Sequence, residues 1–576
     1  MKHNPEKTYL QFDFSANGPV AFKDPITTIS TWDIDEVEQC LDRIGQLIEK
    51  GFYAAGYISY EAAYAFGSQT ENAPKISMPL LWFGIYNKTR APSSLPRAHF
   101  SISEWQLTQS RNDYEKAFQK IKEAIERGET EQVNYTVKFE ADFSGSALPY
   151  YDQLKRAQQG SYSAYLNTGK DEILSASPEL FFHAKNDVVT VKPMKGTIHR
   201  GKTYEEDLRN LHWLKTSEKN KMENELILSL MRDELKNVAT EESIHIVKRY
   251  EVEKYPTVYQ MTSTIKGTVR PKFSAIDILK NLFPCGSISG VPKQTTMDLI
   301  AQLEKNARDV YCGAIGYITP ENEAIFNVPI RTVAIDRRVG KARYGAGGAI
   351  TIDSELGEEY REVLTKAKIL REKREPFELI ETFGLINGQY IVFEEHLKRL
   401  QHSAAYFDFP IDIDSIKKKL LQYKKEYVEG KWRLRLLVDE NGKESWEVCP
   451  LEETASVKAS LAKTPIDKLD PFLYHKTTNR KIHNEKLKEI SGASEALLWN
   501  GDREITEFTI GNVVVDWKGR LLTPPVECGL LPGTFRERLL QEGVIEEEKI
   551  YLDQLNECTF IWLINSVREW VPVYLA

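Results

Sequence analysis

Lys195 is the residue whose type and position point most directly to chemistry. It lies in residues 191–197 (VKPMKGT), between the strand-like run 187–191 (DVVTV) and the very polar residues 198–202 (IHRGK). An amine at this point can attack carbon, but a free lysine is almost all ammonium at neutral pH. It must therefore be desolvated or lie near positive charge to become a nucleophile. Taken alone, a lysine after a strand is usually a solvated surface charge, so the residues that accompany it decide.

Acidic side chains lie on two predicted helices. Glu223 is in a segment with the apolar stripe of a helix, and residues 357–367 form a second helix-like segment. In the second segment Glu359 and Glu362 are three apart, and Lys366 follows Glu362 by four residues, so that they share one face. Without further context this pattern describes solvated acidic helices with an internal ion pair.

Eight ordered blocks between residues 115 and 370 supply that context. They resemble the chorismate-utilising enzyme family in order and spacing: QVNY (132–135), SASPELF (175–181), PMKGT (193–197), the Glu223 helix, PCGSISGVPK (284–293), VPIRT (328–332), GAGG (345–348) and the helix from Glu359 to Lys366. Chance agreement over so many blocks is negligible. PMKGT is similar to the Pro-Ile-Lys-Gly-Thr signature of aminodeoxychorismate synthase component I, whereas anthranilate-forming relatives have alanine in place of Lys195.

The resemblance implies a role for each of these residues. It makes Lys195 the nucleophile and Glu179 the general acid, whose apolar neighbours would raise its pKa and keep it protonated for donation. It implies a Mg²⁺ ion held by Glu223 and Glu362, with Glu359 close by, since magnesium takes few protein carboxylates and completes its shell with water or substrate oxygens. The substrate-binding residues that it implies are Arg331, Lys366, Gly347 and Gln132. Arg331 and Lys366 would clamp the carboxylates of the substrate, and the glycines of residues 345–348 would let the backbone approach the ligand closely.

The implied reaction is the amination of chorismate. Lys195 attacks C2 of the ring as the 4-hydroxyl leaves with help from Glu179, and ammonia then adds at C4 and expels the lysine. The product is 4-amino-4-deoxychorismate. Gln260 stands where anthranilate-forming relatives have histidine, which disfavours pyruvate elimination at this site. Gln132 stands where isochorismate-forming relatives have a lysine base for water, which argues against a hydration reaction.

Residues from about 377 to 576 resemble the class IV aminotransferase fold of pyridoxal-phosphate enzymes, and within it 4-amino-4-deoxychorismate lyase. The matching pieces are FELIET (377–382), HLKRL (396–400), HKTTNR (475–480), ITEFTIGN (505–512) and GLLPGTFR (529–536). The resemblance implies that Lys476 carries pyridoxal 5′-phosphate and shuttles protons, and that Glu507 faces the pyridine nitrogen. The phosphate contacts that it implies are Arg399, Thr509 and a helix start at Gly533 and Thr534. We expect Phe508 and Ile510, where many relatives have small polar residues, to narrow the pocket or change the phosphate contacts.

The two halves explain each other, because the product implied for the first is the substrate implied for the second. The second would remove pyruvate and leave 4-aminobenzoate, the aromatic part of folate. One alternative is an anthranilate synthase component I fused to a class IV transaminase, which Lys195 and Gln260 disfavour. Another is a non-catalytic chorismate-binding or scaffold protein. No cysteine lies in a nucleophile-elbow context, so we expect ammonia from solution or from a separate glutamine amidotransferase subunit. A homodimer through the second domain stays open.

Bulk properties exclude several classes of protein. The 576 residues exceed one compact domain. A net charge of −8 argues against nucleic acid as the main partner. No run approaches a membrane span, and the N-terminus lacks the apolar segment of a signal peptide. Six scattered cysteines without a CxxC pair argue against a zinc site or a disulfide framework. We therefore expect a cytoplasmic enzyme.

Two tandem domains are expected to position these residues. Pro376 follows a charged run and discourages helix before it, so we divide the chain into residues 1–371 and 372–576. Residues 113–126 have helical spacing, and residues 432–438 alternate like a strand that runs into a turn. The expected fold class is α+β. The first domain would be an antiparallel β-sandwich with flanking helices, and the second a two-subdomain α/β class IV aminotransferase-like fold.

Overall fold

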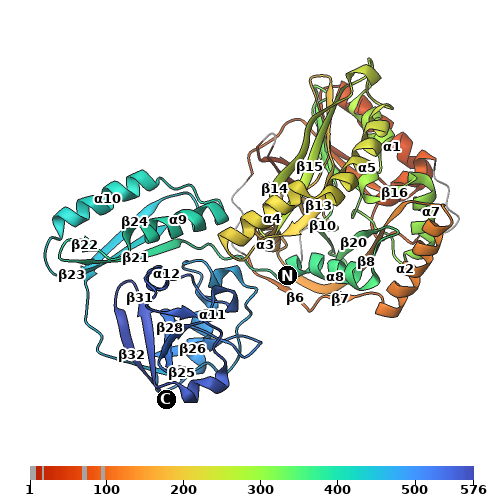
Figure 1. Ribbon diagram of the computed structural model, residues 1–576. Helices are drawn as coiled ribbons and strands as arrows, with labels where there is room; N and C mark the ends of the chain where they lie inside the picture. Colours follow the sequence, from red (N-terminus) through yellow and green to blue (C-terminus); the bar gives the residue numbers. More distant parts are fainter. Residues whose placement is uncertain (1–7, 16–17, 68–73, 93–97) are drawn as a thin grey trace. The chain divides into compact units, whose positions relative to one another are not determined.

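The computed structural model describes residues 8–15, 18–67, 74–92 and 98–576. It is a mixed α+β fold that divides into two compact units (Figure 1). The first unit comprises Met1–His199 and Trp213–Arg374, and the second comprises Arg200–His212 and Glu375–Ala576. The main division lies close to the expected one between residues 371 and 372. The predicted division placed Arg200–His212 in the first domain, whereas in the structure this segment groups with the second unit.

The first unit contains two ten-stranded sheets, in which every recorded strand pair is antiparallel. The first sheet has the order β16 (Gly290–Val291), β8 (Gln132–Gly145), β20 (Lys341–Ile350), β19 (Thr332–Asp336), β10 (Asp171–Ser177), β9 (Tyr162–Asn167), β1 (Tyr9–Phe14) and β2 (Val20–Lys23), with β6 (Phe100–Ile102) and β7 (Gln106–Leu107) paired to β8. The glycine-rich run 345–348 lies within β20 and pairs with β8 in register.

The second sheet carries Lys195 on an end strand of its main path. Its order is β13 (Met194–His199), β15 (Val258–Thr268), β12 (Val188–Lys192), β11 (Leu180–Lys185), β18 (Ala324–Asn327), β17 (Ala314–Ile318), β4 (Tyr53–Ile58), β5 (Leu81–Tyr86) and β3 (Thr27–Thr31), with β14 (His245–Lys254) paired to β15. The strand-like run before Lys195 is therefore β12, and Lys195 is the second residue of the next strand, β13.

Residues of both sheets of the first unit pack together in one of its hydrophobic clusters. β1 alternates as YLQFDF, and its buried residues Leu10, Phe12 and Phe14 pack with residues of the second sheet. The Phe12 and Tyr317 rings, one from each sheet, are 5.3 Å apart in a T-shaped contact. This alternation is what a strand with one buried face requires.

Helices cover the outer faces of these sheets. Helices α1 (Val37–Glu49), α5 (Glu218–Leu235) and α6 (Ala275–Leu282) share a core with the second sheet. Helices α2 (Arg111–Glu126), α3 (Leu148–Gln158) and α8 (Leu356–Ala367) share a core with the first sheet, and α7 (Lys293–Leu303) contributes to both cores. The helix expected at residues 113–126 is α2, which begins with a capping box formed by Ser110 and Asp113.

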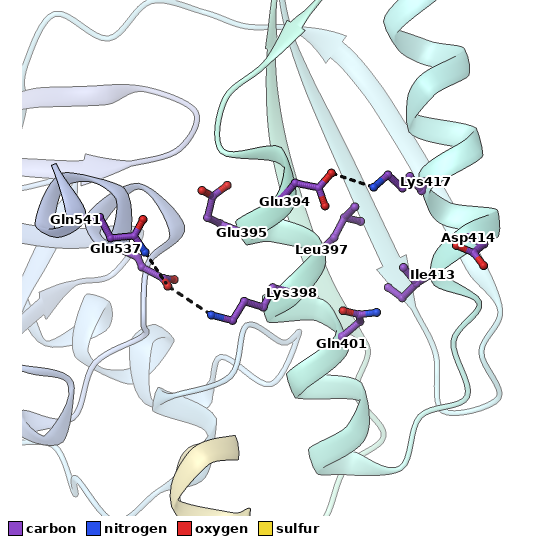
Figure 2. Close-up of a pocket in the computed structure, with 10 residues that line it drawn as sticks. All are labelled: Glu394, Glu395, Leu397, Lys398, Gln401, Ile413, Asp414, Lys417, Glu537 and Gln541. Carbon is purple, nitrogen blue, oxygen red and sulfur yellow. Dashed lines mark hydrogen bonds and ion pairs between the residues drawn. The ribbon is translucent and has the colours of Figure 1, made fainter.

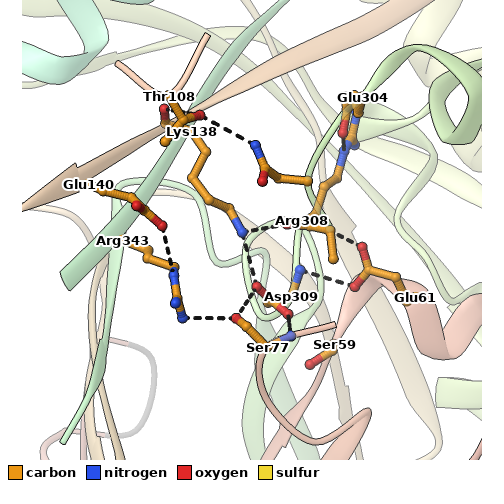
Figure 3. Close-up of polar contacts among 12 residues, drawn as sticks. Ser59, Glu61, Ser77, Thr108, Lys138, Glu140, Glu304, Arg308, Asp309 and Arg343 are labelled. Carbon is orange, nitrogen blue, oxygen red and sulfur yellow. Dashed lines mark hydrogen bonds and ion pairs between the residues drawn. The ribbon is translucent and has the colours of Figure 1, made fainter. Parts of the chain in front are cut away.

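A buried polar network surrounds Arg308 in the first unit (Figure 3). The Arg308 guanidinium donates to both carboxylate oxygens of Glu304, at 2.7 and 2.9 Å. It also donates to the backbone carbonyls of Ile288 at 3.0 Å and Asn134 at 2.6 Å. Burial, with Asp309 beside it, raises the pKa of Glu61 to about 8, and this carboxyl group accepts the backbone N–H of Arg308 at 2.6 Å. The network therefore ties β8 to the turn at residues 286–288.

The second unit has two sheets with separate cores. An antiparallel sheet has the order β22 (Gln389–Tyr390), β21 (Leu379–Ile386), β23 (Lys431–Val438) and β24 (Glu444–Pro450). Helices α9 (Phe393–Phe407) and α10 (Ile413–Glu426) pack on it. The strand expected at residues 432–438 is β23, which turns at Asp439 into β24.

The other sheet of the second unit closes on itself. It contains eight strands in the order β27 (Ile505–Phe508), β26 (Glu495–Trp499), β25 (Val457–Leu461), β32 (Glu569–Leu575), β31 (Phe560–Asn565), β28 (Gly511–Trp517), β29 (Arg520–Thr523) and β30 (Glu546–Glu547). Because β27 also pairs with β28, the strands from β27 to β28 form a closed barrel. Helix α11 (Lys481–Glu489) directly follows the motif HKTTNR, which contains Lys476. Helix α12 (Thr534–Gln541) begins at Thr534, one of the predicted phosphate contacts.

One helix crosses a boundary between the two units along the chain. Helix α4 (Tyr204–Thr216) begins in the segment Arg200–His212, which groups with the second unit, and its residues from Trp213 on group with the first unit. Within the part of the chain that the structure describes, no helix combines the length and the hydrophobicity needed to cross a membrane.

Candidate functional sites

Lys195 lies in a β-bulge. Met194 pairs with Thr262 and Thr197 pairs with Gln260, so three steps along β13 face two steps along β15. Such an extra residue re-aims the side chain at the bulge. Gly196 has a φ of 101°, and a Cβ at this position would come within 3.0 Å of a neighbouring side-chain oxygen. The Lys-Gly pair of the motif thus has a local cause, because only glycine adopts this conformation without strain.

The lysine that follows β12 is anchored and its amine is destabilised as a cation. Asn224 donates to the Lys195 backbone carbonyl at 3.1 Å, and Ser263 donates to Asn224 at 2.6 Å. Burial is the largest effect on Lys195 and lowers its pKa; Glu223 opposes this effect and Lys366 reinforces it. The neutral amine that a nucleophile requires is therefore favoured relative to a free lysine.

Glu179 is poised to hold a proton near neutral pH. Its side chain is 5% exposed, and burial raises its pKa to about 7, against the opposing effects of Ser287 and then Lys195. The Ser287 hydroxyl donates to Glu179 Oε1 at 2.8 Å. Ser287 lies in the turn that Arg308 holds, and the sequence analysis assigned it no role. A carboxyl group with this pKa is suited to general acid catalysis.

The acidic face of α8 lies against the glycines of β20. A Cβ added to Gly348 would come within 2.9 Å of Glu359 Oε2. Lys366 Nζ is 2.5 Å from the carboxylate of Glu362 and donates to the Gly347 carbonyl at 2.7 Å. Burial raises the pKa of Glu359, whereas for Glu362 burial is outweighed by Lys366 and its pKa is lowered. One carboxylate of the pair is thus stabilised as an anion.

Arg331 holds the end of α8. It has a φ of 53°, and its Nη1 donates to the Lys366 backbone carbonyl at 2.6 Å. Its charge also acts on Glu362 and contributes to lowering the pKa of that carboxyl group. The structure therefore brings Arg331, Lys366 and Glu362 together, as the resemblance implied for a site that binds a substrate with two carboxylates.

The carboxylates around Lys195 could bind a hard cation such as magnesium only if a bound ligand or water supplied further oxygen atoms. Among the described residues, no three histidine, cysteine or acidic side chains are close enough together to hold a metal ion. Glu223 and Glu362 both act electrostatically on Lys195, and both offer carboxylate oxygens. This donor set fits magnesium, which is bound by one or two carboxylates and by substrate oxygens.

The two glutamines, Gln132 and Gln260, lie on strands of different sheets. The Gln132 side chain is 3% exposed on β8, and its amide nitrogen has no hydrogen-bond partner among the described residues. Gln260 accepts a hydrogen bond from the Thr197 hydroxyl at 2.8 Å, beside the bulge. That Gln132 contacts the substrate stays a prediction, as do the other residue roles in this site.

Lys476 is the centre of a second group of charges, in the second unit. Its backbone carbonyl accepts from Ile380 at 2.9 Å. Burial lowers the pKa of Lys476 to about 8, with Arg399 and Arg480 acting in the same direction. Glu507 opposes this shift. A lysine with such a pKa has a large neutral fraction at physiological pH.

Glu507 has partners that the sequence analysis did not name. It is 3% exposed, and its Oε1 is 3.1 Å from His483 Nε2 on α11. Its Oε2 accepts from the Leu531 backbone at 3.1 Å. These contacts hold the carboxylate in one orientation, as a group that faces a ring nitrogen requires.

Arg399 is oriented by Glu381. Its Nε and Nη2 donate to the two carboxylate oxygens of Glu381 at 2.9 and 2.8 Å. His396 contacts the same carboxylate at 2.6 Å. Burial would raise the pKa of Glu381, but Arg399 and His396 outweigh it and hold the pKa at about 2. Glu381 and His396 are in the FELIET and HLKRL motifs, where the sequence analysis gave them no role.

The start of α12 fits a phosphate group. Gly533 precedes Thr534, the first residue of this helix, and the first N–H groups of a helix bind anions well. A Cβ at Gly533 would lie 1.9 Å from Asn512 Oδ1, so glycine is required there. Arg399 Nη1 donates to the Pro532 carbonyl at 3.3 Å, next to this turn. A guanidinium and a helix start thus lie side by side.

The stretch after Glu507 differs from what its residue types suggested. The Thr509 hydroxyl donates to Glu495, and its backbone N–H donates to Ala496 at 3.2 Å, so both groups have protein partners. Its contact with the cofactor stays a prediction. Phe508 packs in the barrel core and Ile510 is 40% exposed. The packing of Phe508 in the barrel core gives no support to a narrowing by its ring, and the effect of these two residues on the cofactor contacts stays a prediction.

Two cavities lie in the second unit. One of about 690 Å³ is lined by Arg399, Gly533 and His475, among others. A shallower one of about 490 Å³ lies among α9, α10 and α12 (Figure 2). In the second cavity, Lys417 pairs with Glu394 at 2.9 Å. None of the residues predicted to bind the cofactor or the substrate lines this cavity. The first cavity therefore adjoins the candidate phosphate site.

The fold and these two sites agree with two known families. The chain belongs to the chorismate binding enzyme family, which matches residues 6–372. The amino-transferase class IV family matches residues 378–575. Both family predictions are confirmed, and Arg200–His212 lies within the range matched by the first family.

Known relatives match about half of the chain. Aminodeoxychorismate synthase component 1 of Escherichia coli is 34% identical over 279 residues, which are 48% of this chain and 61% of that protein. Anthranilate synthase component 1 of Saccharolobus solfataricus is 33% identical over 272 residues, 47% of this chain and 64% of that protein. The match thus spans less than two thirds of each. Anthranilate synthase component I of Streptococcus pneumoniae shares the fold, with a TM-score of 0.54 at 22% identity over 65% of this chain and 94% of that one.

Proposed function

We propose that the chain makes 4-aminobenzoate from chorismate in two steps. The first unit aminates chorismate to 4-amino-4-deoxychorismate, and the second unit eliminates pyruvate from that product. The observation that carries the proposal is a bulged lysine whose pKa is lowered, set beside a buried carboxyl group whose pKa is raised to about 7. An amine and an acid in these protonation states are what the first step needs. The identity with the relatives is similar for aminodeoxychorismate synthase and for anthranilate synthase. Lys195 is the residue that favours 4-amino-4-deoxychorismate over anthranilate as the product.

The first step is a substitution at C4 through the enzyme amine. Neutral Lys195 attacks C2, the ring double bond shifts, and the C4–O bond breaks while Glu179 gives its proton to the departing hydroxyl. Water leaves. Ammonia then attacks C4, the double bond shifts back, and the C2–N bond to Lys195 breaks. A proton from the new amine returns to Glu179, so chorismate and ammonia give the product and water.

Charged residues position the substrate for this step. Arg331 and Lys366 would bind its carboxylates, the arginine through its planar fork. Glu223 and Glu362, with Glu359 close by, would hold Mg²⁺. When bound, the ion offsets carboxylate charge and polarises a departing oxygen.

The second step needs one lysine in two protonation states. Lys476 would carry pyridoxal 5′-phosphate, which supplies an electron sink when bound. Arg399, the start of α12 at Gly533 and Thr534 and, as expected from the resemblance, Thr509 would hold its phosphate, and Glu507 its ring nitrogen. Lys476 takes the proton from the carbon that bears the amino group and gives a proton to the departing enolpyruvyl oxygen. Its pKa of about 8 suits both transfers.

Ammonia is proposed to come from a separate glutamine amidotransferase subunit. Glutamine hydrolysis by a cysteine requires a thiolate, whereas burial raises the pKa of Cys312 and of Cys528 to about 12. We place the enzyme in the cytoplasm, where its six cysteines, all free in the structure, stay reduced. We also propose that two copies of the chain form a homodimer through the second unit. Measuring the molecular mass of the purified protein in solution tests this part of the proposal.

Product analysis tests the proposed function. The purified chain is incubated with chorismate, ammonium, Mg²⁺ and pyridoxal 5′-phosphate, and the aromatic product is identified by chromatography and mass spectrometry. We expect 4-aminobenzoate and pyruvate. Lys195→Ala should abolish formation of the amino intermediate. Lys192→Ala should not, because the Lys192 amine pairs with Glu253. Anthranilate as the main product, or normal amination by Lys195→Ala, would refute the proposal.

A further inference from the structure

A short segment from the first family's range is built into the second unit. Arg200–His212 follows β13, the strand with Lys195, directly along the chain, yet it groups with Glu375–Ala576. The sequence family matched at residues 6–372 includes it. The second unit is therefore not made of the C-terminal sequence alone.

A buried ion pair shapes this segment. Arg200 donates to both carboxylate oxygens of Asp207, from Nε at 2.6 Å and from Nη2 at 2.8 Å. The two side chains are 5% and 3% exposed. Asp207 also accepts the Gly201 N–H at 2.9 Å. A Cβ at Gly201 would lie 2.1 Å from the Asp207 nitrogen, so the turn is closed tightly around the carboxylate.

The pair is docked on the end of α9. Arg200 Nη2 donates to the Tyr406 backbone carbonyl at 2.8 Å, and the Tyr406 hydroxyl donates back to the Gly201 carbonyl at 2.8 Å. Further along the segment, the Tyr204 and His402 rings stack with their centroids 4.4 Å apart. Two hydrogen bonds in opposite directions and a ring stack thus fix the segment to one helix.

A stack of three side chains leads from Arg200 to the neighbour of Lys476. The Arg200 guanidinium carbon lies 4.3 Å from the centroid of the Tyr406 ring. The His475 ring is 4.2 Å from the same centroid, at an interplanar angle of 32°. The Arg200 guanidinium and the His475 ring therefore both pack against the ring of Tyr406.

His475 is itself fully packed. It is 4% exposed, and its Nδ1 is 3.0 Å from the Ser403 hydroxyl. Burial lowers its pKa to about 3, so the ring is neutral at physiological pH. It contacts the Tyr406 and Phe407 rings and the Ser403 hydroxyl, and the next residue in the chain is Lys476.

We propose that Arg200, acting through Tyr406 and His475, is a positioning residue for Lys476, so that Arg200–His212 is a working part of the second unit's lysine site. Loss of Arg200 removes one of the two groups packed against Tyr406, and it also removes two hydrogen bonds to the buried carboxylate of Asp207, which is costly for a buried charge. His475 then loses its fixed stack. The Lys476 side chain gains water and moves towards the behaviour of a free lysine.

The experiment measures the Lys476 amine in the full chain without cofactor or substrate. Acetic anhydride labels neutral amines, and mass spectrometry gives the extent of Lys476 acetylation over a series of pH values. In Arg200→Ala we expect the midpoint to rise by about one unit, which at pH 8 lowers the labelling about fivefold. Arg209→Ala changes an exposed arginine of the same segment and should leave the midpoint unchanged.

A second variant separates position from charge. Arg200→Lys keeps the positive charge but lacks the planar fork and stacks poorly, so its midpoint should also rise. It carries the test if Arg200→Ala does not fold, as judged by circular dichroism. A folded Arg200 variant with an unchanged Lys476 midpoint overturns the proposal, even when thermal unfolding occurs at lower temperature. Although the expected importance of Lys476 rests on the proposed function, the labelling does not depend on it, so each can fail separately.

Discussion

Removing the Ser287 hydroxyl should raise the pKa of Glu179 further. Ser287 donates to the Glu179 carboxylate at 2.8 Å and is the largest effect that opposes burial. This hydrogen bond stabilises the charged carboxylate and so lowers the pKa. In Ser287→Ala that stabilisation is lost, while burial, which raises the pKa, remains. The Glu179 proton should therefore be held to higher pH.

The size of the shift follows from the strength of such a bond. A hydrogen bond to a charged group is worth about 1.5–3 kcal/mol, and one pKa unit corresponds to about 1.4 kcal/mol. Ser287 is partly exposed, so water replaces some of the lost contact and the lower end of the range applies. We expect the pKa to rise from about 7 by roughly one unit. At pH 8 the protonated fraction of Glu179 then rises from about one tenth to about one half.

The pH dependence of kcat/KM for chorismate measures this shift. Ammonium and Mg²⁺ are kept saturating, and 4-amino-4-deoxychorismate formation is followed from acid to alkaline pH. The inflection near pH 7 that disappears in Glu179→Gln should move up by about one unit in Ser287→Ala. Ser287→Thr keeps a hydroxyl and should stay near wild type, and Ser229→Ala, on the exposed side of α5, is the matched control. An unmoved inflection in Ser287→Ala contradicts the assignment of Glu179 as the acid that titrates.

Three further changes test the other parts of the two sites. Glu362→Gln should lower Mg²⁺-dependent amination at least tenfold but leave the release of 4-aminobenzoate from supplied 4-amino-4-deoxychorismate intact; equal loss of both activities would argue against a magnesium role confined to the first unit. Lys476→Ala should make the chain accumulate the amino intermediate, whereas Lys481→Ala, an exposed lysine nearby, should not; abundant 4-aminobenzoate from Lys476→Ala would show that the second unit is not the lyase. Gly533→Ala places a methyl group 1.9 Å from Asn512 Oδ1 and should weaken binding of pyridoxal 5′-phosphate about tenfold in an absorbance titration, and unchanged binding would exclude a phosphate site at this turn.

Short motifs made the lysine sites predictable, because the local backbone explains their residue types. In PMKGT the glycine after Lys195 is needed at a positive φ, and the bulge it allows aims the lysine. In GLLPGTFR the glycine is needed because Asn512 occupies the space of a Cβ at Gly533. Such constraints act within a few residues, so they are visible in the sequence.

The partners of these residues could not be predicted, since they come from distant parts of the chain. Ser287 reaches Glu179 across more than a hundred residues, and His483 reaches Glu507 from another element. A serine or a histidine outside a known motif carries no sign of which carboxylate it will meet. The cation that acts on Lys195 also comes from a distant part of the chain, since it is Lys366, whereas the nearby Lys192 pairs with Glu253.

The second unit shows the same limit on a larger scale. Its boundary near residue 375 follows from a proline after a charged run, which is a local signal. The grouping of Arg200–His212 with this unit depends on a buried pair and a ring stack with residues some two hundred positions away. Nothing in the segment's own pattern distinguishes it from a polar loop of the first unit. Only the packed structure shows where such a segment belongs.

The pKa values of the two lysines are lowered for the same physical reason in two different folds. In each, burial is the largest effect that lowers the pKa, and a nearby cation acts with it, Lys366 for Lys195 and Arg399 for Lys476. Each cation is itself held by a carboxylate, Glu362 or Glu381. Removing that carboxylate would free the cation to move away, whereas removing the cation would let the lysine gain a proton. The carboxylates therefore support reactivity indirectly, although their charge alone would oppose it, and this is why each site combines cations and anions around one amine.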